Sequence, residues 1–250
     1  MDIVEATVKR VSCRAFTRQA IEPEKVAALE GEIARINEES GLSFQLYGPR
    51  EDGTAIDLFP KLFATNSPLY AAFVAQEGPL PEEKLGYYGE QFVLAATQLG
   101  LGTCWVAGTY DHETVRVELA EGEKLHDVIP IGYAMDRVPI KQRTFRGGLR
   151  ARNKQPEALW QGPTPLAEAP AWVASCIDAV IGGPSACNGQ PVVFVQEGPD
   201  APITAKISCF KYGLEFTDLG IAKLHFEIAA RACGVPGSWE WGDGGAFVLE

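Results

Sequence analysis

The sequence predicts an α+β fold with an internal duplication, and three observations lead to this prediction. Apolar residues recur at helical spacing in several stretches. Short runs of alternating or continuously apolar residues lie between them and are typical of strands. In addition, Gln91–Trp105 aligns without gaps on His225–Trp239, whose numbers differ by 134, with Phe, Ala-Ala, Gly and Trp in register. Gly86 and Gly220 match at the same offset. Chance similarity between two amphipathic helices would explain the matching alanines, but not a helix, a glycine and a tryptophan that all recur in register.

In the first half, predicted helices and strands alternate along the chain. Pro23 lies in the first turn of the first predicted helix, and Gly41 ends it. The run 69–75 is almost continuously apolar, so we expect a central strand there. The predicted elements are a helix over 23–40, strands over 43–47 and 69–75, a long helix over 82–99, a helix over 114–120 and a strand over 128–134.

The second half is predicted to repeat this order of helix, strand, long helix and strand. An amphipathic helix around 172–180 precedes a strand over 192–195. The basic segment 139–152 is expected to be an exposed linker, and the Pro- and Ala-rich segment 163–170 to be a junction. The predicted domains are residues 1–155 and residues 156–250.

The composition limits the classes of partner. With 250 residues, of which 46% are hydrophobic, the chain can bury a sizeable core. Its formal net charge of −11 argues against nucleic acid and against an anionic membrane surface. We expect no signal peptide and no membrane span, because no apolar stretch approaches the roughly 20 residues that a span requires. The six cysteines show no metal-ligand spacing, so we predict no metal site, reduced thiols and a cytoplasmic location.

Two segments carry the polar groups of a candidate ligand site. Arg10, Ser12 and Arg14 combine two guanidinium forks with a hydroxyl, which suits a phosphate, although a solvated basic turn has the same composition. The connector 183–191 has two prolines that fix φ and polar side chains that suit a planar ligand with hydrogen-bonding groups. The alternative for the connector is a plain helix stop followed by a strand start. Each half of the chain carries one of these motifs and lacks the other.

The two motifs together resemble those of the nitroreductase family of flavoproteins, in the branch that fuses two nitroreductase-like halves in one chain. The resemblance implies a three-layer α/β/α nitroreductase-like fold and a tightly bound FMN. The FMN contacts that it implies are Arg10, Ser12, Arg14, Lys141 and Arg143 at the phosphate, the backbone of Trp105, Val106, Ala107 and Gly108 at flavin N5, and Pro184, Ser185 and Asn188 over the ring.

The resemblance also implies an activity. Such a chain would be an oxidoreductase in which NAD(P)H, a transient electron donor, reduces a small-molecule acceptor such as a nitroaromatic, a quinone or an enone through flavin N5. The sequence has no Gly-x-Gly-x-x-Gly fingerprint of a separate dinucleotide domain, and no catalytic side chain is assigned beyond the flavin. Because each motif occurs once, we expect one flavin per chain and a site that a monomer can complete. The alternatives are a flavin store or redox sensor, and a chain that binds a free nucleotide or a corrinoid-like cofactor.

Overall fold

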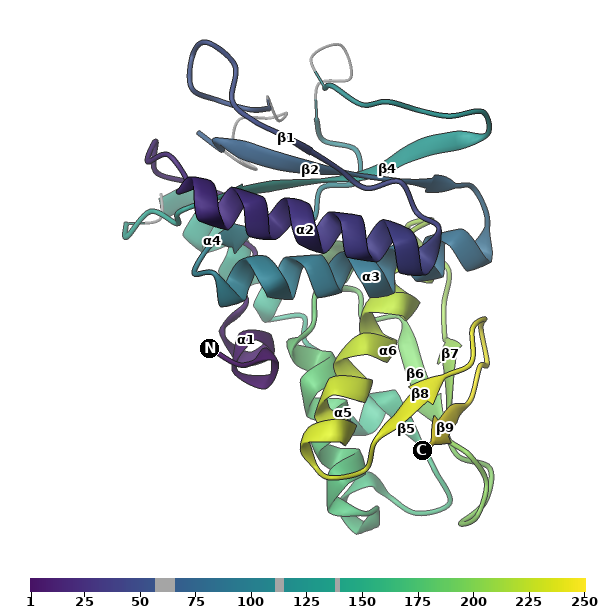
Figure 1. The fold of residues 1–250 in the computed structure, drawn as a ribbon. Coiled ribbons are helices and arrows are strands. Elements are labelled where there is room, and N and C mark those ends of the chain that lie inside the picture. The colour runs from purple at the N-terminus through teal and green to yellow at the C-terminus, as the bar shows by residue number, and fades with distance from the viewer. Residues whose placement is uncertain (57–65, 111–114, 138–139) are drawn as a thin grey trace. The chain divides into compact units, whose positions relative to one another are not determined.

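The computed structural model describes residues 1–56, 66–110, 115–137 and 140–250, except for the side chains of residues 141, 142, 145, 146 and 150. Figure 1 follows the chain through its helices and strands. Two compact units are formed: unit 1 consists of Met1–Asp2, Lys9–Glu77 and Gln91–Gly148, and unit 2 of Ile3–Val8, Gly78–Glu90 and Leu149–Glu250. This division follows the packing of the chain, whereas the boundary predicted at residue 155 follows the repeat and stays a prediction.

Unit 1 is built on an antiparallel four-stranded sheet in the order β1-β2-β4-β3. Its strands are β1 (Gln45–Tyr47), β2 (Leu69–Gln76), β3 (Gly102–Thr103) and β4 (Glu123–Gly132). β2 is buried along nearly its whole length and lies between β1 and β4, which confirms the predicted central strand. Leu69 of β2 is paired with Ile131 of β4, and a bulge interrupts their register between Phe73 and Val74.

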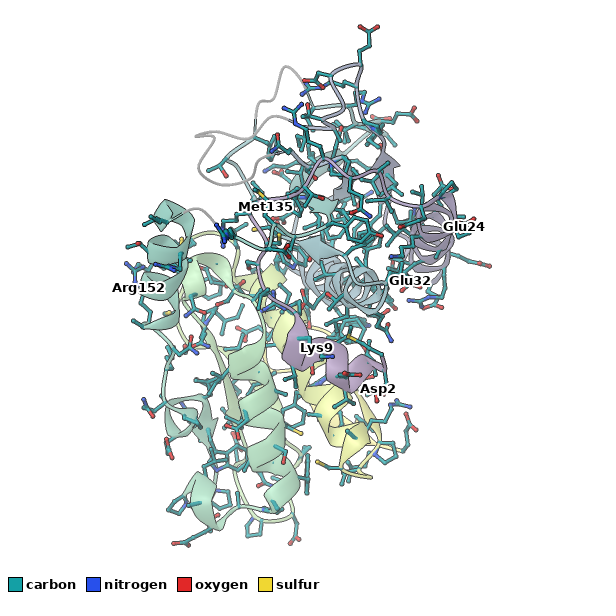
Figure 2. The ribbon with its side chains drawn as sticks, turned by 90° about the vertical axis from the view of Figure 1, so that its left-hand side faces the viewer. Asp2, Lys9, Glu24, Glu32, Met135 and Arg152 are labelled. Atoms are coloured by element: carbon teal, nitrogen blue, oxygen red, sulfur yellow. The ribbon has the colours of Figure 1, made fainter. Side chains whose placement is uncertain are left out.

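Helix α2 (Pro23–Ser40) begins and ends where the sequence predicts. Pro23 occupies the first turn, where its missing N–H leaves no helical hydrogen bond unmade. Gly41 caps the other end with φ 73°, a left-handed conformation that glycine adopts without steric strain. Figure 2 labels two residues of this helix: Glu24, which is exposed, and Glu32, which is half-buried and forms an ion pair with Arg35. The buried residues of α2 are Leu29, Ile33 and Ile36.

Helix α3 (Pro79–Gln98) confirms the predicted long helix and starts three residues earlier than predicted. Its part from Gln91 onward belongs to unit 1. There Phe92 packs edge-on against Phe73 of β2, with ring centroids 5.8 Å apart. The Arg35 guanidinium of α2 donates to the Gln91 side chain at 2.9 Å. These contacts fix α2 and the second part of α3 against the sheet of unit 1.

The helix predicted over 114–120 is wrong for residues 115–120, and Thr114 lies outside the described residues. The segment is irregular because side chains of the neighbouring strands satisfy its backbone. The Tyr70 hydroxyl accepts a hydrogen bond from Arg116 N at 2.8 Å and donates one to Arg116 O at 2.7 Å. Gln45 forms two similar bonds with the Glu118 backbone. The alternating Val115 and Val117 also pack on the core of unit 1, which a helix would not allow.

The segment 139–152, expected to be in part an exposed linker, contains a helix that the sequence analysis did not predict. Residues Ile140–Arg150 form helix α4, and Pro139 lies outside the described residues. Six of its eleven residues are Lys, Gln, Arg or Leu, which favour a helix, whereas Gly147 and Gly148 disfavour one. The basic residues of this segment lie on this helix, except for Arg152, which follows it, and the described side chains of Arg143 and Arg152 are exposed.

Unit 2 contains the elements predicted for the second half. Besides the first part of α3, its helices are α1 (Ile3–Lys9, of which Lys9 belongs to unit 1), α5 (Ala171–Gly182), α6 (Glu215–Ala232) and the short η1 (Pro156–Leu159), η2 (Leu166–Glu168) and η3 (Ala186–Asn188). One sheet joins β5 (Trp160–Gln161) in parallel to β6 (Val192–Val195), and β6 antiparallel to β7 (Thr204–Ile207). A separate ribbon pairs β8 (Gly237–Trp239) with β9 (Phe247–Leu249).

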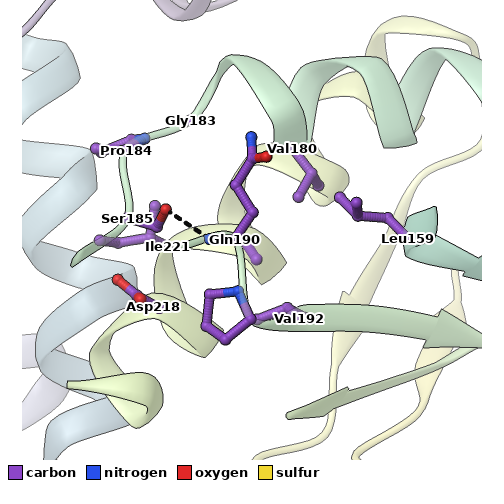
Figure 3. A pocket seen from close by; sticks show the side chains of 11 residues that line it. Leu159, Val180, Gly183, Pro184, Ser185, Gln190, Val192, Asp218 and Ile221 are labelled. Carbon is purple, nitrogen blue, oxygen red and sulfur yellow. Dashed lines mark hydrogen bonds between the residues drawn. The ribbon is translucent and has the colours of Figure 1, made fainter. Parts of the chain in front are cut away.

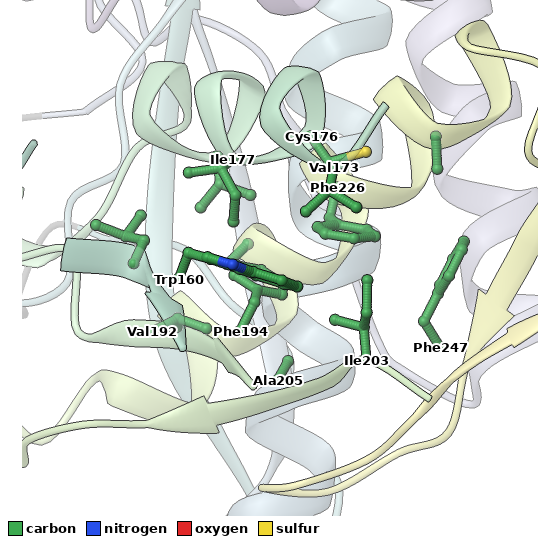
Figure 4. Packing of buried hydrophobic residues seen from close by; sticks show 14 of the residues in the cluster. Trp160, Val173, Cys176, Ile177, Val192, Phe194, Ile203, Ala205, Phe226 and Phe247 are labelled. Carbon is green, nitrogen blue, oxygen red and sulfur yellow. The ribbon is translucent and has the colours of Figure 1, made fainter. Parts of the chain in front are cut away.

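The core of unit 2 is a cluster of aromatic rings between α5, α6 and the strands (Figure 4). Phe226 of α6 stacks on Phe194 of β6, with ring centroids 4.8 Å apart. Trp239 and Phe247 pack on the same Phe226 ring at 5.1 and 5.3 Å. Burying rings of this size is a dominant source of stability, so α6 is the central element of unit 2.

Two further observations concern the whole described part of the chain. No helix within it has both the length and the apolar character that crossing a membrane requires. All six cysteines are free thiols, and Cys13, Cys104 and Cys176 are buried.

Candidate functional site

The N-terminal motif lies along an edge of the sheet of unit 1. After α1 ends at Lys9, Ser12 pairs in parallel with Thr103 of β3, and Cys13 N donates to Thr103 O at 2.7 Å. Gly102 allows this close approach, since a Cβ at that position would lie 2.8 Å from the Cβ of Cys13. The motif is therefore an extended segment held by main-chain hydrogen bonds.

Arg10, Ser12 and Arg14 come together around the buried thiol of Cys104. Burial raises the pKa of Cys104, and the positive charges of Arg14 and Arg10 and a hydrogen bond with Ser12 oppose this effect only in part. The thiol is therefore neutral near pH 7 and adds no negative charge beside the two arginines. The three residues of the motif are each half-buried and converge on one place in unit 1. This is the arrangement that an anionic group requires.

The segment 105–108, which directly follows Cys104, provides backbone donors. The Trp105 ring packs edge-on against Phe73, with centroids 5.3 Å apart. Val106 must be removed from the predicted donors, because its N–H donates to Val128 O at 3.1 Å and its carbonyl accepts from Val128 N at 2.9 Å. Within the described part of the chain, the N–H groups of Ala107 and Gly108 have no hydrogen-bond acceptor, and Gly108 is exposed.

The late basic pair of the sequence prediction falls on α4. The side chain of Lys141 lies outside the described residues, so its predicted phosphate contact stays a prediction. Arg143 is exposed on the helix, and its predicted role also stays a prediction.

The connector after α5 is a strained loop in unit 2. Cys187, Asn188 and Gln190 have φ values of 50°, 56° and 46°, in the left-handed region that non-glycine residues seldom occupy. Such conformations cost on the order of 1 kcal/mol each and persist only where the surroundings hold them. A plain helix stop needs no such strain, so the loop is shaped by more than the chain reversal.

Side chains within and around this loop fix its shape (Figure 3). The Asp218 carboxylate of α6 accepts from Ala186 N at 2.9 and 3.2 Å. The Ser185 hydroxyl accepts from Gln190 N at 3.0 Å. The Asn188 amide donates to Leu149 O and to Asn153 Oδ1, both at 2.8 Å, so its NH₂ group is used within unit 2. Only the Asn188 Oδ1 atom is left for the ligand contact that the sequence predicts.

A small pocket lies beneath the loop, lined by Gly183, Pro184, Ser185 and Gln190 and by Asp218 of α6 (Figure 3). Its cavity volume is about 20 Å³, which suits about one water molecule and no organic ring. The pocket is therefore a packing defect beside the buried Asp218, and a planar ligand would have to meet the outer face of the loop.

The histidines do not form a catalytic set in the described residues. His225 of α6 is fully buried, its Nε2 lies 3.0 Å from Glu90 Oε1, and its ring packs under Gly183 at the start of the loop. His126 lies on β4 in unit 1, and His112 falls outside the described residues. No group of three or more His, Cys, Asp or Glu residues in the described ranges could hold a metal ion. Asp218 and the Glu90–His225 pair were missed by the sequence analysis, because no motif marks a helix residue that supports a distant loop.

The sequence matches the family described as "Putative TM nitroreductase" over residues 2–230. The chain belongs to this family. Among solved structures it is similar to a "putative nitroreductase" of Thermotoga maritima MSB8, with a TM-score of 0.66, 20% identity, and coverage of 100% of this chain and 93% of that one. This likeness confirms the predicted α+β nitroreductase-like fold.

Other solved nitroreductases match about half of the chain. One is a Bacteroides fragilis nitroreductase with bound FMN, with a TM-score of 0.42, 17% identity, and coverage of 56% of this chain and 92% of that one. Another is an FMN-dependent nitroreductase of Clostridium difficile R20291, with a TM-score of 0.41, 18% identity, and coverage of 53% and 88%. None of the curated proteins compared with the chain matches it.

Proposed function

We propose that this nitroreductase-family chain is an FMN-dependent oxidoreductase that uses NAD(P)H to reduce a small organic acceptor. The observation that carries the proposal is the cluster in unit 1, where Arg10, Ser12 and Arg14 lie near Cys104 and two backbone N–H groups without an acceptor among the described residues follow at Ala107 and Gly108. Family membership and the FMN-containing relatives support the same cofactor.

The residues of unit 1 fit the two ends of an FMN molecule. The guanidinium groups of Arg10 and Arg14 and the Ser12 hydroxyl would bind the phosphate, for which a chain of net charge −11 needs local cations. The N–H groups of Ala107 and Gly108 would face the N5 edge of the ring. We further propose, from the sequence motif, that Lys141 and Arg143 add to the phosphate contacts and that Trp105 borders the ring.

The loop of unit 2 fits a planar ring. Pro184 and Ser185 form its rigid start, and Ser185 keeps a hydroxyl proton to donate because its oxygen is the acceptor for Gln190 N. Asn188 keeps its Oδ1 as an acceptor. We propose that these three residues cover the isoalloxazine, and that the buried Asp218 positions them.

The chemistry itself would belong to the cofactor. Bound FMN supplies hydride acceptance and donation at N5, for which nitroaromatics, quinones and enones are suitable acceptors. The chain would bind and orient the ring, and the backbone N–H groups of Ala107 and Gly108 would donate hydrogen bonds to the N5 edge of the oxidised ring, which makes N5 a better hydride acceptor. Cys104 takes no part as a nucleophile, because its pKa is raised by burial.

The test begins with the absorption spectrum of the purified protein and the titration of apo-protein with FMN. Arg10→Ala and Arg14→Ala should lose flavin, whereas Arg35→Ala should keep it, because Arg35 pairs with Glu32 and Glu39 on α2. Anaerobic addition of NADH or NADPH should bleach the bound flavin, and an acceptor should restore its colour. Full flavin content in both motif variants would overturn the site. A bound flavin that neither nucleotide bleaches would favour the flavin store or redox sensor.

A further inference from the structure

Within unit 2, the start of α3 and helix α6 cross with the symmetry that the repeat predicts. A Cβ on Gly86 would lie 2.0 Å from Thr217 O, and a Cβ on Gly220 would lie 1.9 Å from Glu83 O. Gly86 and Gly220 differ by 134 in number, and so do Glu83 and Thr217. The two contacts are therefore exchanged by the repeat, as in an isologous two-fold interface. This supports the register of the alignment independently of the sequence match.

In that register, Glu240–Gly242 of unit 2 matches Val106–Gly108 of unit 1. The two segments differ in what their backbone groups do. Gly242 N donates to Glu83 Oε2 at 2.6 Å, whereas the N–H of the matching Gly108 has no acceptor in the described part of the chain. The carbonyls of Glu240 and Gly242 accept from Lys223 Nζ at 2.8 and 3.0 Å.

The groups that bind this segment form a buried ion pair. Lys223 Nζ lies 2.5 Å from Glu83 Oε1, and both side chains are fully buried. Burial lowers the pKa of Lys223, and Glu83 opposes that effect. Lys223 thus makes three contacts and Glu83 two, which satisfies most of the hydrogen-bonding capacity of two charges removed from water.

The positions that the repeat relates to this pair cannot form an equivalent ion pair. The position that matches Lys223 is Gly89, and the position that matches Glu83 is Thr217, so no ion pair can form. A third difference lies within the segment itself. Ala107 is matched by Trp241, whose ring packs against Tyr87 and Tyr88 with centroids 5.4 and 6.2 Å away.

We propose that the Glu83–Lys223 ion pair, together with Trp241, closes a second isoalloxazine position in unit 2 and thereby limits the chain to one flavin. The inference rests on the proposed function, since it takes the segment 106–108 to be the flavin edge. The sequence already lacks a second phosphate motif, and the ion pair and Trp241 would in addition block the position of a second ring. The N–H that would face a ring is already bonded, and the side chains of Lys223 and Trp241 fill the place where the first half has glycine and alanine.

The first test replaces the three side chains of the proposed closure with smaller, uncharged ones. The variant Glu83→Thr/Lys223→Ala/Trp241→Ala is saturated with FMN and titrated with lumiflavin, an isoalloxazine that needs no phosphate site. The wild-type chain should bind no lumiflavin beyond its FMN, and the variant should bind one, so that ring stoichiometry rises from one to two. The control is Glu77→Thr/Lys124→Ala, which removes an exposed ion pair and should leave the stoichiometry at one.

The second test changes different residues, so it decides the question where the first variant does not fold. The variant Gly89→Lys/Thr217→Glu introduces a lysine and a glutamate at the positions that match Lys223 and Glu83. The variant Gly89→Ala/Thr217→Val is its uncharged control. The charged variant should lose at least tenfold in FMN affinity, and the control should not, with folding of both followed by circular dichroism. One flavin in wild type and in every folded variant would overturn the inference. No flavin in wild type would instead overturn the proposed function.

Discussion

The two motifs of the candidate site are held in place by different means. The segment 10–14 of unit 1 is fixed by main-chain pairing with Thr103, which does not depend on the identity of its side chains. The loop 184–190 of unit 2 contains three non-glycine residues in the left-handed region and is held by side chains, above all by Asp218 of α6. The turn after β8, residues 240–242, is also held by side chains, because Lys223 and Glu83 bond its backbone.

This difference determines how each region should respond to mutation. Main-chain pairing survives the loss of a side chain, so variants in the segment 10–14 should affect the ligand more than the fold. Buried charged and polar groups behave oppositely, because removing one partner leaves the other unsatisfied in a low dielectric. Unit 2 therefore depends on single side chains that lie far apart in sequence.

The largest effect is expected for Lys223→Met in unit 2. The substitution leaves the Glu83 carboxylate buried without its cation, which typically costs about 3–5 kcal/mol. Urea unfolding followed by circular dichroism would measure the loss. Glu83→Gln/Lys223→Met removes both charges and should recover most of that stability. Equal destabilisation by the single and the double variant would contradict the role of the ion pair.

The next effect is expected in the main-chain-held segment. Arg10→Ala removes charge-assisted hydrogen bonds worth roughly 1.5–3 kcal/mol each, so FMN affinity should fall by at least about tenfold. The free energy of unfolding of the apo-protein should change little, because Ser12 and Cys13 keep their pairing with Thr103. Fluorescence titration with FMN and urea unfolding, run on the same preparations, separate the two quantities. A large loss of apo-protein stability would show that the segment 10–14, like the loop 184–190, depends on its side chains.

The variant Asp218→Ala is expected to lose both stability and FMN affinity. The Ala186 N–H loses its buried acceptor, which costs about 1–3 kcal/mol and allows the strained loop to relax. Stability and FMN affinity should therefore fall together, unlike in Arg10→Ala. Asp218→Asn retains an oxygen acceptor and should lose less of both. Wild-type FMN affinity in a folded Asp218→Ala variant would show that the loop shape does not matter to the flavin.

The smallest effect is a pH dependence near the start of α6. Burial alone would raise the pKa of Glu215, but hydrogen bonds from the Tyr212 and Lys211 N–H groups outweigh it, so the pKa lies below 4.5. A carboxylate with a lowered pKa in the folded state stabilises the fold above its unfolded pKa, and this contribution is lost as pH falls through the lower folded value. The melting temperature of wild type should therefore fall more steeply, as the pH is lowered below 4.5, than the melting temperature of Glu215→Gln. Parallel pH profiles would contradict this sign.

Local chemistry allowed several elements to be predicted from the sequence. Pro23 and Gly41 bound α2, and the apolar run 69–75 is the central strand β2, because backbone geometry and burial dictate these residue types directly. The failed helix over 115–120 shows the limit of such signals. There Tyr70 and Gln45, distant in sequence, satisfy the backbone and decide the conformation.

The sequence by itself identified the two motifs from local spacing and the chemistry of individual side chains, and their resemblance to the nitroreductase family led to the fold family. Tertiary structure decided which of their groups are available. In the fold, the N–H of Val106 donates to Val128 O, and the NH₂ group of Asn188 donates to Leu149 O and Asn153 Oδ1. It also brought Asp218 and the Glu83–Lys223 pair to their loops. A hydrogen bond or ion pair depends on distance in space, and helices and strands bring together partners whose sequence separation carries no local signal.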